Sequence, residues 1–228
     1  MQLYYIRHGE PTYNPDQLTE KGHKQAEALG EVLQHHGIDR IFASSSTRAR
    51  QTAEPLANLT GKEITLLDWC HESLAWEDFT VSEGENKKRW VFQSERCVAD
   101  FSSDAVYALR DRWADYPTFE DTNCKRGVCR VAAEADAFLA QFGLIRDNES
   151  HCYRAENLFD GKVALFAHEG FGHIFLPYVF FMPHPLFARF DIAHTGVTIL
   201  DFTPYEDGRV FPRLKCVSDT GHLVGKNL

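Results

Sequence analysis

The feature that most constrains the fold is a short apolar run at the start of the chain, Leu3–Ile6, which leads directly into Arg7, His8 and Gly9. Such a run, with no polar alternation, is typical of a strand buried on both faces in the middle of a parallel sheet. Gly9 allows the backbone to turn sharply or to approach a ligand closely. The sequence therefore predicts that Arg7 and His8 lie at the carboxyl end of a central strand, where open α/β sheets bind ligands.

The chemistry of this pair is specific. An imidazole beside a guanidinium tends to stay neutral, because the fixed cation disfavours a second positive charge. A neutral imidazole is a nucleophile, and the planar fork of an arginine matches phosphate oxygens. Taken alone, the tripeptide Arg7-His8-Gly9 is equally compatible with a hydrogen-bonded histidine at a strand end, so the functional interpretation needs further residues.

The rest of the chain predicts alternating strands and helices. Thr19 is a candidate N-cap for a helix that ends at Gly37, and Ser44–Ser46 precede a helix that Pro55 should bend. Further strands are predicted over residues 38–43, 63–67, 162–167, 196–202 and 209–217. A long helix is predicted over 128–142 and another after residue 168. Residues 11–17 are predicted to form a loop, and residues 83–89 a solvated loop and helix start.

This order predicts an α/β fold, a three-layer α/β/α sandwich with a mainly parallel sheet. Residues 76–130 break the alternation and are interpreted as a helical insertion over the active edge of the sheet, with a helix through Val106, Leu109 and Trp113 that ends at Pro117. A length of 228 residues without a low-complexity linker favours a single domain, 1–228, that contains this insertion.

Composition limits the partners. A net charge of −9 argues against nucleic acid, whose phosphates need a basic face, although a few arginines can still dominate one pocket. The longest apolar stretch, near Ile174–Met182, is too short to span a membrane. Six scattered cysteines and the lack of a signal-like start favour reduced thiols and a cytoplasmic location. The sequence leaves the oligomeric state open.

A second histidine has a similar setting. His168 follows the predicted strand 162–167, and glycine comes two residues later at Gly170. Neighbouring parallel strands would bring His8 and His168 to one edge of the sheet. Arg48 lies at the start of the helix after the second strand, at the same edge, where free backbone N–H groups favour an anion. Alternatively, His168 caps a helix.

Four motifs in this order resemble the histidine phosphatase superfamily, the phosphoglycerate-mutase-like proteins. They cover about residues 1–75 and 160–202: Arg7-His8-Gly9-Glu10 with Asn14, Leu18-Thr19-x-x-Gly22-x-x-Gln25-Ala26, Ser45-Ser46-Thr47-Arg48-Ala49-x-Gln51-Thr52-Ala53 and His168-x-Gly170.

The resemblance implies a phosphatase that hydrolyses a small phosphorylated substrate, a phosphomonoester, through phosphohistidine, without a metal or other cofactor. It implies that His8 is the nucleophile and that Glu72 gives a proton to the leaving alcohol. Arg7, Arg48 and His168 would bind and stabilise the phosphoryl group in catalysis. The phosphate-binding set that it implies is Arg7, Asn14, Arg48, His168 and Glu169.

Some features depart from the family pattern. The stretch after Asn14 is short for a mutase, which disfavours a phosphoglycerate-type mutase and makes it the alternative to a phosphatase. A non-catalytic phosphate-binding module is the second alternative. Glu77 and Asp78 compete with Glu72 for the role of proton donor.

Other patterns carry less weight. The histidines of His168–His173 are five residues apart, which is unlike a zinc-binding helix. A zinc site built from Cys97, Cys124, Cys129 and the pair His151-Cys152 lacks a Cys-x-x-Cys pair. The basic residues of the insertion are interpreted as a solvated face, with a lid over an anionic leaving group as the alternative; they are Lys87, Lys88, Arg89, Lys125 and Arg126.

Overall fold

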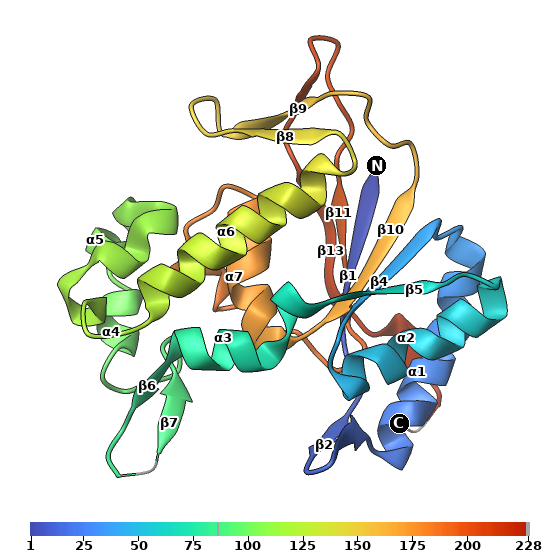
Figure 1. Ribbon diagram of the computed structural model, residues 1–228, viewed down its shortest axis with the longest axis horizontal. Helices are drawn as coiled ribbons and strands as arrows, with labels where there is room; N and C mark the ends of the chain where they lie inside the picture. The colour runs from blue at the N-terminus through green and yellow to red at the C-terminus, as the bar shows by residue number, and fades with distance from the viewer. Residues whose placement is uncertain (86, 227–228) are drawn as a thin grey trace.

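The computed structural model describes residues 1–85 and 87–226 and has a six-stranded sheet at its centre (Figure 1). In spatial order its strands are β13 (Arg213–Asp219), β11 (Val197–Asp201), β1 (Gln2–Arg7), β10 (Lys162–Ala167), β4 (Arg40–Ser44) and β5 (Ile64–Leu67). The strands β1, β10, β4 and β5 run parallel, whereas β11 and β13 are antiparallel additions at one side. The predicted mainly parallel sheet is confirmed, with β1 in its interior.

The register of β1 and β10 sets the position of the two histidines. Arg7 lies opposite Ala167 in the ladder, and the backbone N–H of His8 donates to the carbonyl of Ala167 over 3.0 Å. His8 and His168 therefore follow the two strands at the same edge of the sheet.

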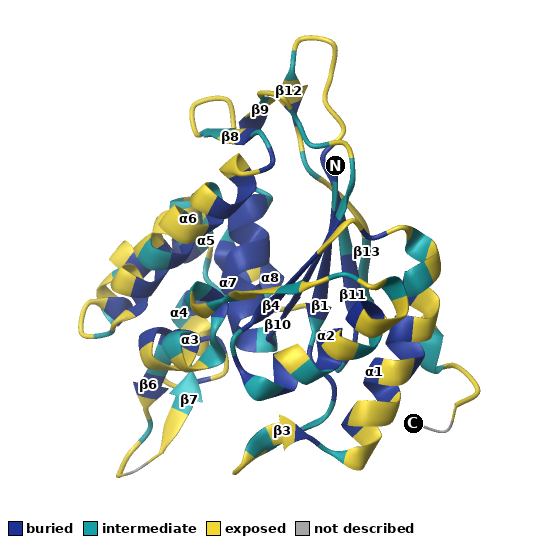
Figure 2. Ribbon diagram, turned by 45° about the vertical axis from the view of Figure 1, so that its right-hand side comes forward, coloured by how far each residue is buried: buried dark blue, intermediate teal, exposed yellow. Residues whose placement is uncertain are grey.

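Both faces of β1 are buried, as its apolar run predicts. Leu3 and Tyr5 belong to one hydrophobic core, and Tyr4 and Ile6 belong to a second core on the other face. The first core lies against α6 (Cys124–Ala140) and α7 (Glu169–Val179), and the second lies against α1 (Glu20–Leu33) and α2 (Thr47–Thr60). In Figure 2, β1, β10 and α7 are mostly buried while α1 exposes its outer face. The three layers are confirmed.

The predicted helix signals act as expected. Thr19 caps α1 by accepting from the backbone N–H of Gly22, and Ser46 caps α2 by accepting from that of Ala49. Gly37 has a φ of 68°, which ends the helical segment that begins with α1. Pro55 stays inside α2, where its ring packs against α1 at Gly30.

The insertion differs from its prediction. The stretch predicted as a loop and helix start, residues 83–89, contains no helix in its described part. It follows β6 (Thr80–Ser82), and its last two residues belong to β7 (Lys88–Trp90), which pairs with β6 in a hairpin. The predicted helix through Trp113 breaks at Arg110, which has a φ of 57°. The buried indole of Trp113 packs edge-on against the rings of Phe101 and Phe119. The predicted insertion, residues 76–130, begins within α3 (Glu72–Phe79) and ends within α6. Between them lie α4 (Val98–Phe101), α5 (Asp104–Leu109) and the 3-10 helices η3 (Arg110–Asp115) and η4 (Pro117–Phe119).

Several short strands were not predicted. The loop predicted over residues 11–17 is a hairpin of β2 (Pro11–Tyr13) and β3 (Asp16–Leu18). The strand predicted over 209–217 is divided between β12 (Arg209–Val210) and β13, and β12 joins β8 (Leu144–Asp147) and β9 (Cys152–Ala155) in a small separate sheet. The remaining helices are α8 (His184–Phe187), η1 (Gln34–His36), η2 (Asp68–Cys70) and η5 (Gly221–Leu223).

Two general properties bear on the sequence predictions. All six cysteines are free thiols. In the described part of the chain, no helix combines the length and the apolar character needed to cross a bilayer.

Two glycines allow the turn after β1 to lie directly on the start of α1. A Cβ on Gly22 would lie 2.1 Å from the backbone oxygen of Glu10, and a Cβ on Gly9 would lie 2.7 Å from the backbone oxygen of Gly22. Both obstacles are backbone atoms, so neither can move aside without moving the turn that carries His8. This explains why glycine occurs in both of the first two motifs.

We expect Gly22→Ala to lower the free energy of unfolding by about 1–3 kcal/mol, the usual cost of overpacking. In an open helix position the same change would stabilise, because alanine is the better helix former. Urea unfolding measures the effect, and Glu27→Ala on the exposed face of α1 is the control, expected to change stability by less than about 0.5 kcal/mol. A stabilising Gly22→Ala would contradict the packing described here.

Candidate active site

The structure brings His8 and His168 together at the carboxyl ends of β1 and β10. Their ring centroids are 5.1 Å apart, and both side chains are buried. The convergence expected from the sequence is thus present, and it follows from the parallel pairing of the two strands.

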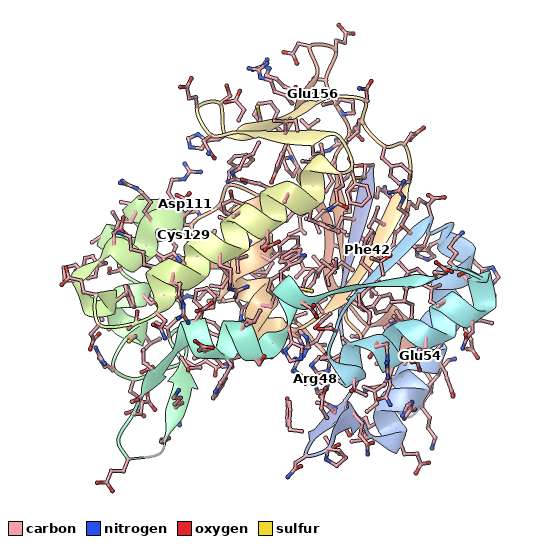
Figure 3. All side chains as sticks on the ribbon, viewed as in Figure 1. Phe42, Arg48, Glu54, Asp111, Cys129 and Glu156 are labelled. Carbon is pink, nitrogen blue, oxygen red and sulfur yellow. The ribbon has the colours of Figure 1, made fainter. Side chains whose placement is uncertain are left out.

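Arg48 connects the two imidazoles. It lies in the first turn of α2, which follows β4, and its side chain is 8% exposed. Its Nε donates to His8 Nε2 over 3.1 Å, one terminal nitrogen lies 3.2 Å from His168 Nδ1, and the other forms an ion pair with Asp16 from β3. Figure 3 shows Arg48 at the start of α2, near the first turn of α3. Each nitrogen of the guanidinium therefore has its own partner.

The hydrogen bonds assign the protons of both rings. His8 Nδ1 lies 2.7 Å from the carbonyl oxygen of Gly9, so it carries the proton, and Nε2 keeps a lone pair directed at Arg48. In His168 the roles are reversed: Nδ1 accepts from Arg48, and Nε2 donates to the Ser44 hydroxyl over 2.8 Å. His8 consequently presents an unprotonated nitrogen toward the centre of the cluster.

Both imidazoles are held neutral. Burial is the main cause that lowers the pKa of His8 well below its ordinary value, and Arg48 and Arg7 lower it further. Burial likewise lowers the pKa of His168, with smaller contributions from His8 and Arg48. A neutral ring beside two guanidinium groups is the form in which an imidazole acts as a nucleophile.

Arg7 completes the cationic side of the site, and Glu169 holds it. A terminal nitrogen of Arg7 forms an ion pair with Glu169 at 3.0 Å and donates to the carbonyl of Ile192. Glu169 was predicted to bind phosphate, but a carboxylate repels phosphate oxygens, and here it contacts Arg7 instead. Burial raises the pKa of Glu169, and Arg7 opposes this.

Glu72 lies at the start of α3, facing the first turn of α7. Its two oxygens accept from the backbone N–H groups of Gly170 and Phe171 at 3.1 and 3.3 Å, and one lies 3.9 Å from His168 Nδ1. Burial raises the pKa of Glu72 to about 7, against the opposing effects of Arg48 and these N–H groups. The indole of Trp90 contributes to this burial, since it and Glu72 Oε1 both lie within 3 Å of the Cβ position that Gly170 lacks.

The two competing acids are directed elsewhere. Asp78 is buried in ion pairs with Arg126 and Arg130, and Glu77 is an exposed partner of Arg126. Neither of them lines the cleft that contains His8. Of the three carboxyl groups considered from the sequence, only Glu72 reaches it.

Asn14 is not part of this cluster. It lies exposed in the turn of the β2–β3 hairpin and does not line the cleft, whereas Asp16, two residues later, contacts Arg48. The resemblance implied that Asn14 binds phosphate from the loop predicted over residues 11–17, but this segment is a hairpin whose turn holds Asn14 outside the cleft. No periodic pattern in the sequence indicates a role for Asp16 or for His194, whose ring centroid lies 5.7 Å from that of His8.

These side chains open into a cleft of about 530 Å³, within the usual range for small-molecule sites. Its lining residues are Arg7, His8, Tyr13, Arg48, His71, Glu72, Ser73, Trp76, Trp90, Glu169 and Gly170. Within residues 1–85 and 87–226, no three His, Cys, Asp or Glu side chains are grouped as metal ligands.

Comparison with known proteins agrees with this geometry. A sequence model of the histidine phosphatase superfamily (branch 1) matches residues 3–115. The chain belongs to this superfamily. Its region of similarity includes Arg7, His8, Arg48 and Glu72, while His168 comes from the later part of the fold.

Curated histidine phosphatase relatives match only part of their length. The chain is 36% identical over 75 residues to a probable phosphoglycerate mutase from Erwinia tasmaniensis, covering 29% of this chain and 35% of that protein. It is 33% identical over 118 residues to an adenosylcobalamin/α-ribazole phosphatase from Salmonella typhi, covering 43% and 56%. The chain thus spans between about a third and just over half of the length of these relatives.

Solved structures share the whole fold. A mycobacterial glucosyl-3-phosphoglycerate phosphatase has a TM-score of 0.61 at 21% identity, covering 95% of this chain and 98% of that chain. A phosphoserine phosphatase from Entamoeba histolytica in complex with 3-phosphoglyceric acid has a TM-score of 0.60 at 19% identity, covering 98% and 99%. At these identities the likeness establishes the fold alone.

The buried imidazoles predict how stability depends on pH. Burial lowers the pKa of His8 and His168, and lowers that of His173 and His194 to about 4 and that of His184 to about 3. Each folded pKa lies below the unfolded value of about 6.5, so the unfolded state takes up protons first as the pH falls. The free energy of unfolding should therefore decrease from pH 7 to pH 5.5, by about 1.4 kcal/mol per pH unit below 6.5 for each imidazole.

Glu72 acts in the opposite direction, because its pKa is raised and the folded state keeps that proton between about pH 4.5 and 7. Glu169 and Asp136, whose pKa values burial also raises, act in the same direction as Glu72, and five imidazoles outweigh these three carboxyl groups. Urea unfolding at several pH values measures how steeply the free energy of unfolding falls with pH. His168→Asn should reduce this slope by the contribution of one imidazole, about 1.4 kcal/mol per pH unit. Constant or rising stability on acidification would contradict the neutral assignment.

Proposed function

We propose that the protein is a metal-independent phosphatase that hydrolyses a small phosphomonoester through a phosphohistidine on His8. The observation that carries the proposal is the unprotonated Nε2 of His8, 3.1 Å from Arg48 Nε and fixed by the Nδ1 contact with Gly9. Two guanidinium groups and His168 surround this nitrogen, and they supply the positive charge that phosphoryl transfer needs.

In the first step, His8 Nε2 attacks phosphorus and the bond from phosphorus to the ester oxygen breaks. Arg7 and Arg48 bind the non-bridging oxygens, on which charge is spread in the transition state. Bound dianionic phosphate also raises the pKa of His168, because an opposite charge favours the protonated ring, so that Nδ1 donates to a phosphoryl oxygen. The protonated Glu72 gives its proton to the departing alkoxide, and the alcohol leaves.

In the second step, water attacks the phosphohistidine in line with the P–N bond. Glu72, now a carboxylate, accepts a proton from this water, the P–N bond breaks, and His8 regains its lone pair. Inorganic phosphate leaves and Glu72 is again protonated. A pKa of about 7 suits both tasks, because the group is able to hold and release a proton near neutral pH.

Replacing His8 with Ala should abolish turnover and acid-labile labelling by a substrate carrying a radioactive phosphoryl group. Among the described residues of the cleft, the only other nitrogen that has a free lone pair and contacts Arg48 is Nδ1 of His168. That atom lies beside Glu72, so it is not placed to replace His8. Acid-quenched labelling in the presence of a chelator measures the intermediate. Retained turnover in the His8 variant would refute the mechanism.

Replacing Glu72 with Gln should lower kcat for an alkyl phosphate by about 10²- to 10⁴-fold, the usual contribution of general acid catalysis. The loss should be smaller for 4-nitrophenyl phosphate, whose leaving group needs no proton. The wild-type rate for the alkyl ester should fall as the pH rises through 7, because Glu72 then loses its proton. Steady-state rates across pH measure both effects.

Glu77→Gln on the same helix is the matched control and should leave both rates unchanged, because Glu77 is exposed and paired with Arg126. An effect of Glu77→Gln equal to that of Glu72→Gln would show that the proton donor is wrongly assigned.

The phosphoglycerate-type mutase stays the second candidate, because curated relatives carry that name. A mutase returns the phosphoryl group to a sugar acid, so phosphate release without mutase products decides for the phosphatase. Absence of turnover across a phosphoester panel would instead indicate a phosphate-binding module. Six free thiols fit the cytoplasmic location expected from the sequence.

A further inference from the structure

We propose that this cleft selects phosphomonoesters whose leaving group is an uncharged alcohol bearing an aromatic ring. The inference rests on the proposed phosphatase activity. It comes from two observations on the same cleft: its charges are already balanced, and its outer walls are aromatic.

The positive charges of the site have partners. Arg48 is paired with Asp16, and Arg7 is paired with Glu169. Among the described residues that line the cleft there is no third arginine and no lysine. Both arginines are needed for the phosphoryl group, so a carboxylate or second phosphate on the leaving group would enter the cleft without a cation to bind it.

The basic residues of the insertion do not supply that cation. Lys87 and Arg89 pair with Glu83 in the β6–β7 hairpin, where Lys88 is exposed on β7. Arg126 pairs with Glu77 and Asp78, and Lys125 pairs with Asp115. None of them lines the cleft. These contacts support the interpretation of the basic residues as a solvated face and not as a lid over an anionic leaving group.

Aromatic rings form the outer walls instead. Trp76 projects from α3 and Trp90 from β7, with their ring centroids 5.0 Å apart and their planes at 90°. Trp90 is held in place by stacking on Phe92, at 5.5 Å and 11° between planes. From the other side, Tyr13 of β2 is 71% exposed, with the Arg48 guanidinium 5.4 Å from its ring centroid.

Two perpendicular indoles make a corner in which a flat ring packs face-on against one and edge-on against the other, the two arrangements that aromatic pairs favour. The same corner lies next to Glu72, because Trp90 shares the space beside Gly170 with that carboxyl group. A ring held there would place its ester oxygen near the proposed proton donor. The insertion thereby becomes the part of the chain that recognises the leaving group.

The test uses three esters of primary alcohols: benzyl phosphate, ethyl phosphate and 3-phosphoglycerate. They present the same phosphoryl group with a ring, with no further group, and with a carboxylate. We expect kcat/KM to follow that order, with benzyl phosphate at least about tenfold above ethyl phosphate, as stacking on indole allows. Trp76 is 40% exposed, so Trp76→Leu is tolerated, and it should reduce the benzyl-to-ethyl ratio about tenfold.

Tyr205→Leu is the control, since Tyr205 is 62% exposed and lies outside the cleft; it should leave the ratio unchanged. The inference is overturned if ethyl phosphate or 3-phosphoglycerate is the best of the three, or if Trp76→Leu does not change the ratio. Failure of the proposed function gives a different result, namely no turnover of any ester by the wild-type protein.

Discussion

The site depends on one buried guanidinium. A buried charge is costly unless it is paired and hydrogen-bonded, and Arg48 meets that requirement with three partners from three different strands or strand ends. Asp16 neutralises it, and the two imidazoles accept from it, which they are able to do only while neutral. The same contacts therefore fix the position of Arg48, the tautomer of His168 and the unprotonated nitrogen of His8. Loss of any partner leaves a charge or a lone pair buried without compensation.

The acidity of Glu72 results from a second balance. Backbone N–H groups at the start of α7 favour its charged form, while burial favours the neutral form and prevails, giving a pKa of about 7. Part of that burial comes from Trp90, which belongs to the insertion and not to the sheet. Under the proposed mechanism the insertion thus acts on the proton donor as well as on the leaving group, so that its sequence would affect acidity and selectivity together.

Local signals predicted the elements that position the site. Three signals were sufficient to predict the central sheet, its layers and the convergence of the two histidines. They are the apolar run into Arg7 and His8, the caps at Thr19 and Ser46, and the pattern of the later strands. The β2–β3 hairpin was not predicted because its polar residues show no strand alternation. Without the hairpin, neither the position of Asn14 outside the cleft nor the contact between Asp16 and Arg48 could be predicted. Tertiary ion pairs, such as that of Glu169, have no sequence period and need coordinates.

The most direct test of this account is a crystal structure of the protein with orthovanadate, grown in the presence of a chelator. The account predicts vanadium bonded to Nε2 of His8, with Arg7, Arg48 and His168 on its equatorial oxygens and Glu72 beside the apical oxygen opposite His8. Vanadate bound elsewhere, or bonded to another residue while Arg48 remains directed only at the imidazoles and Asp16, would contradict it.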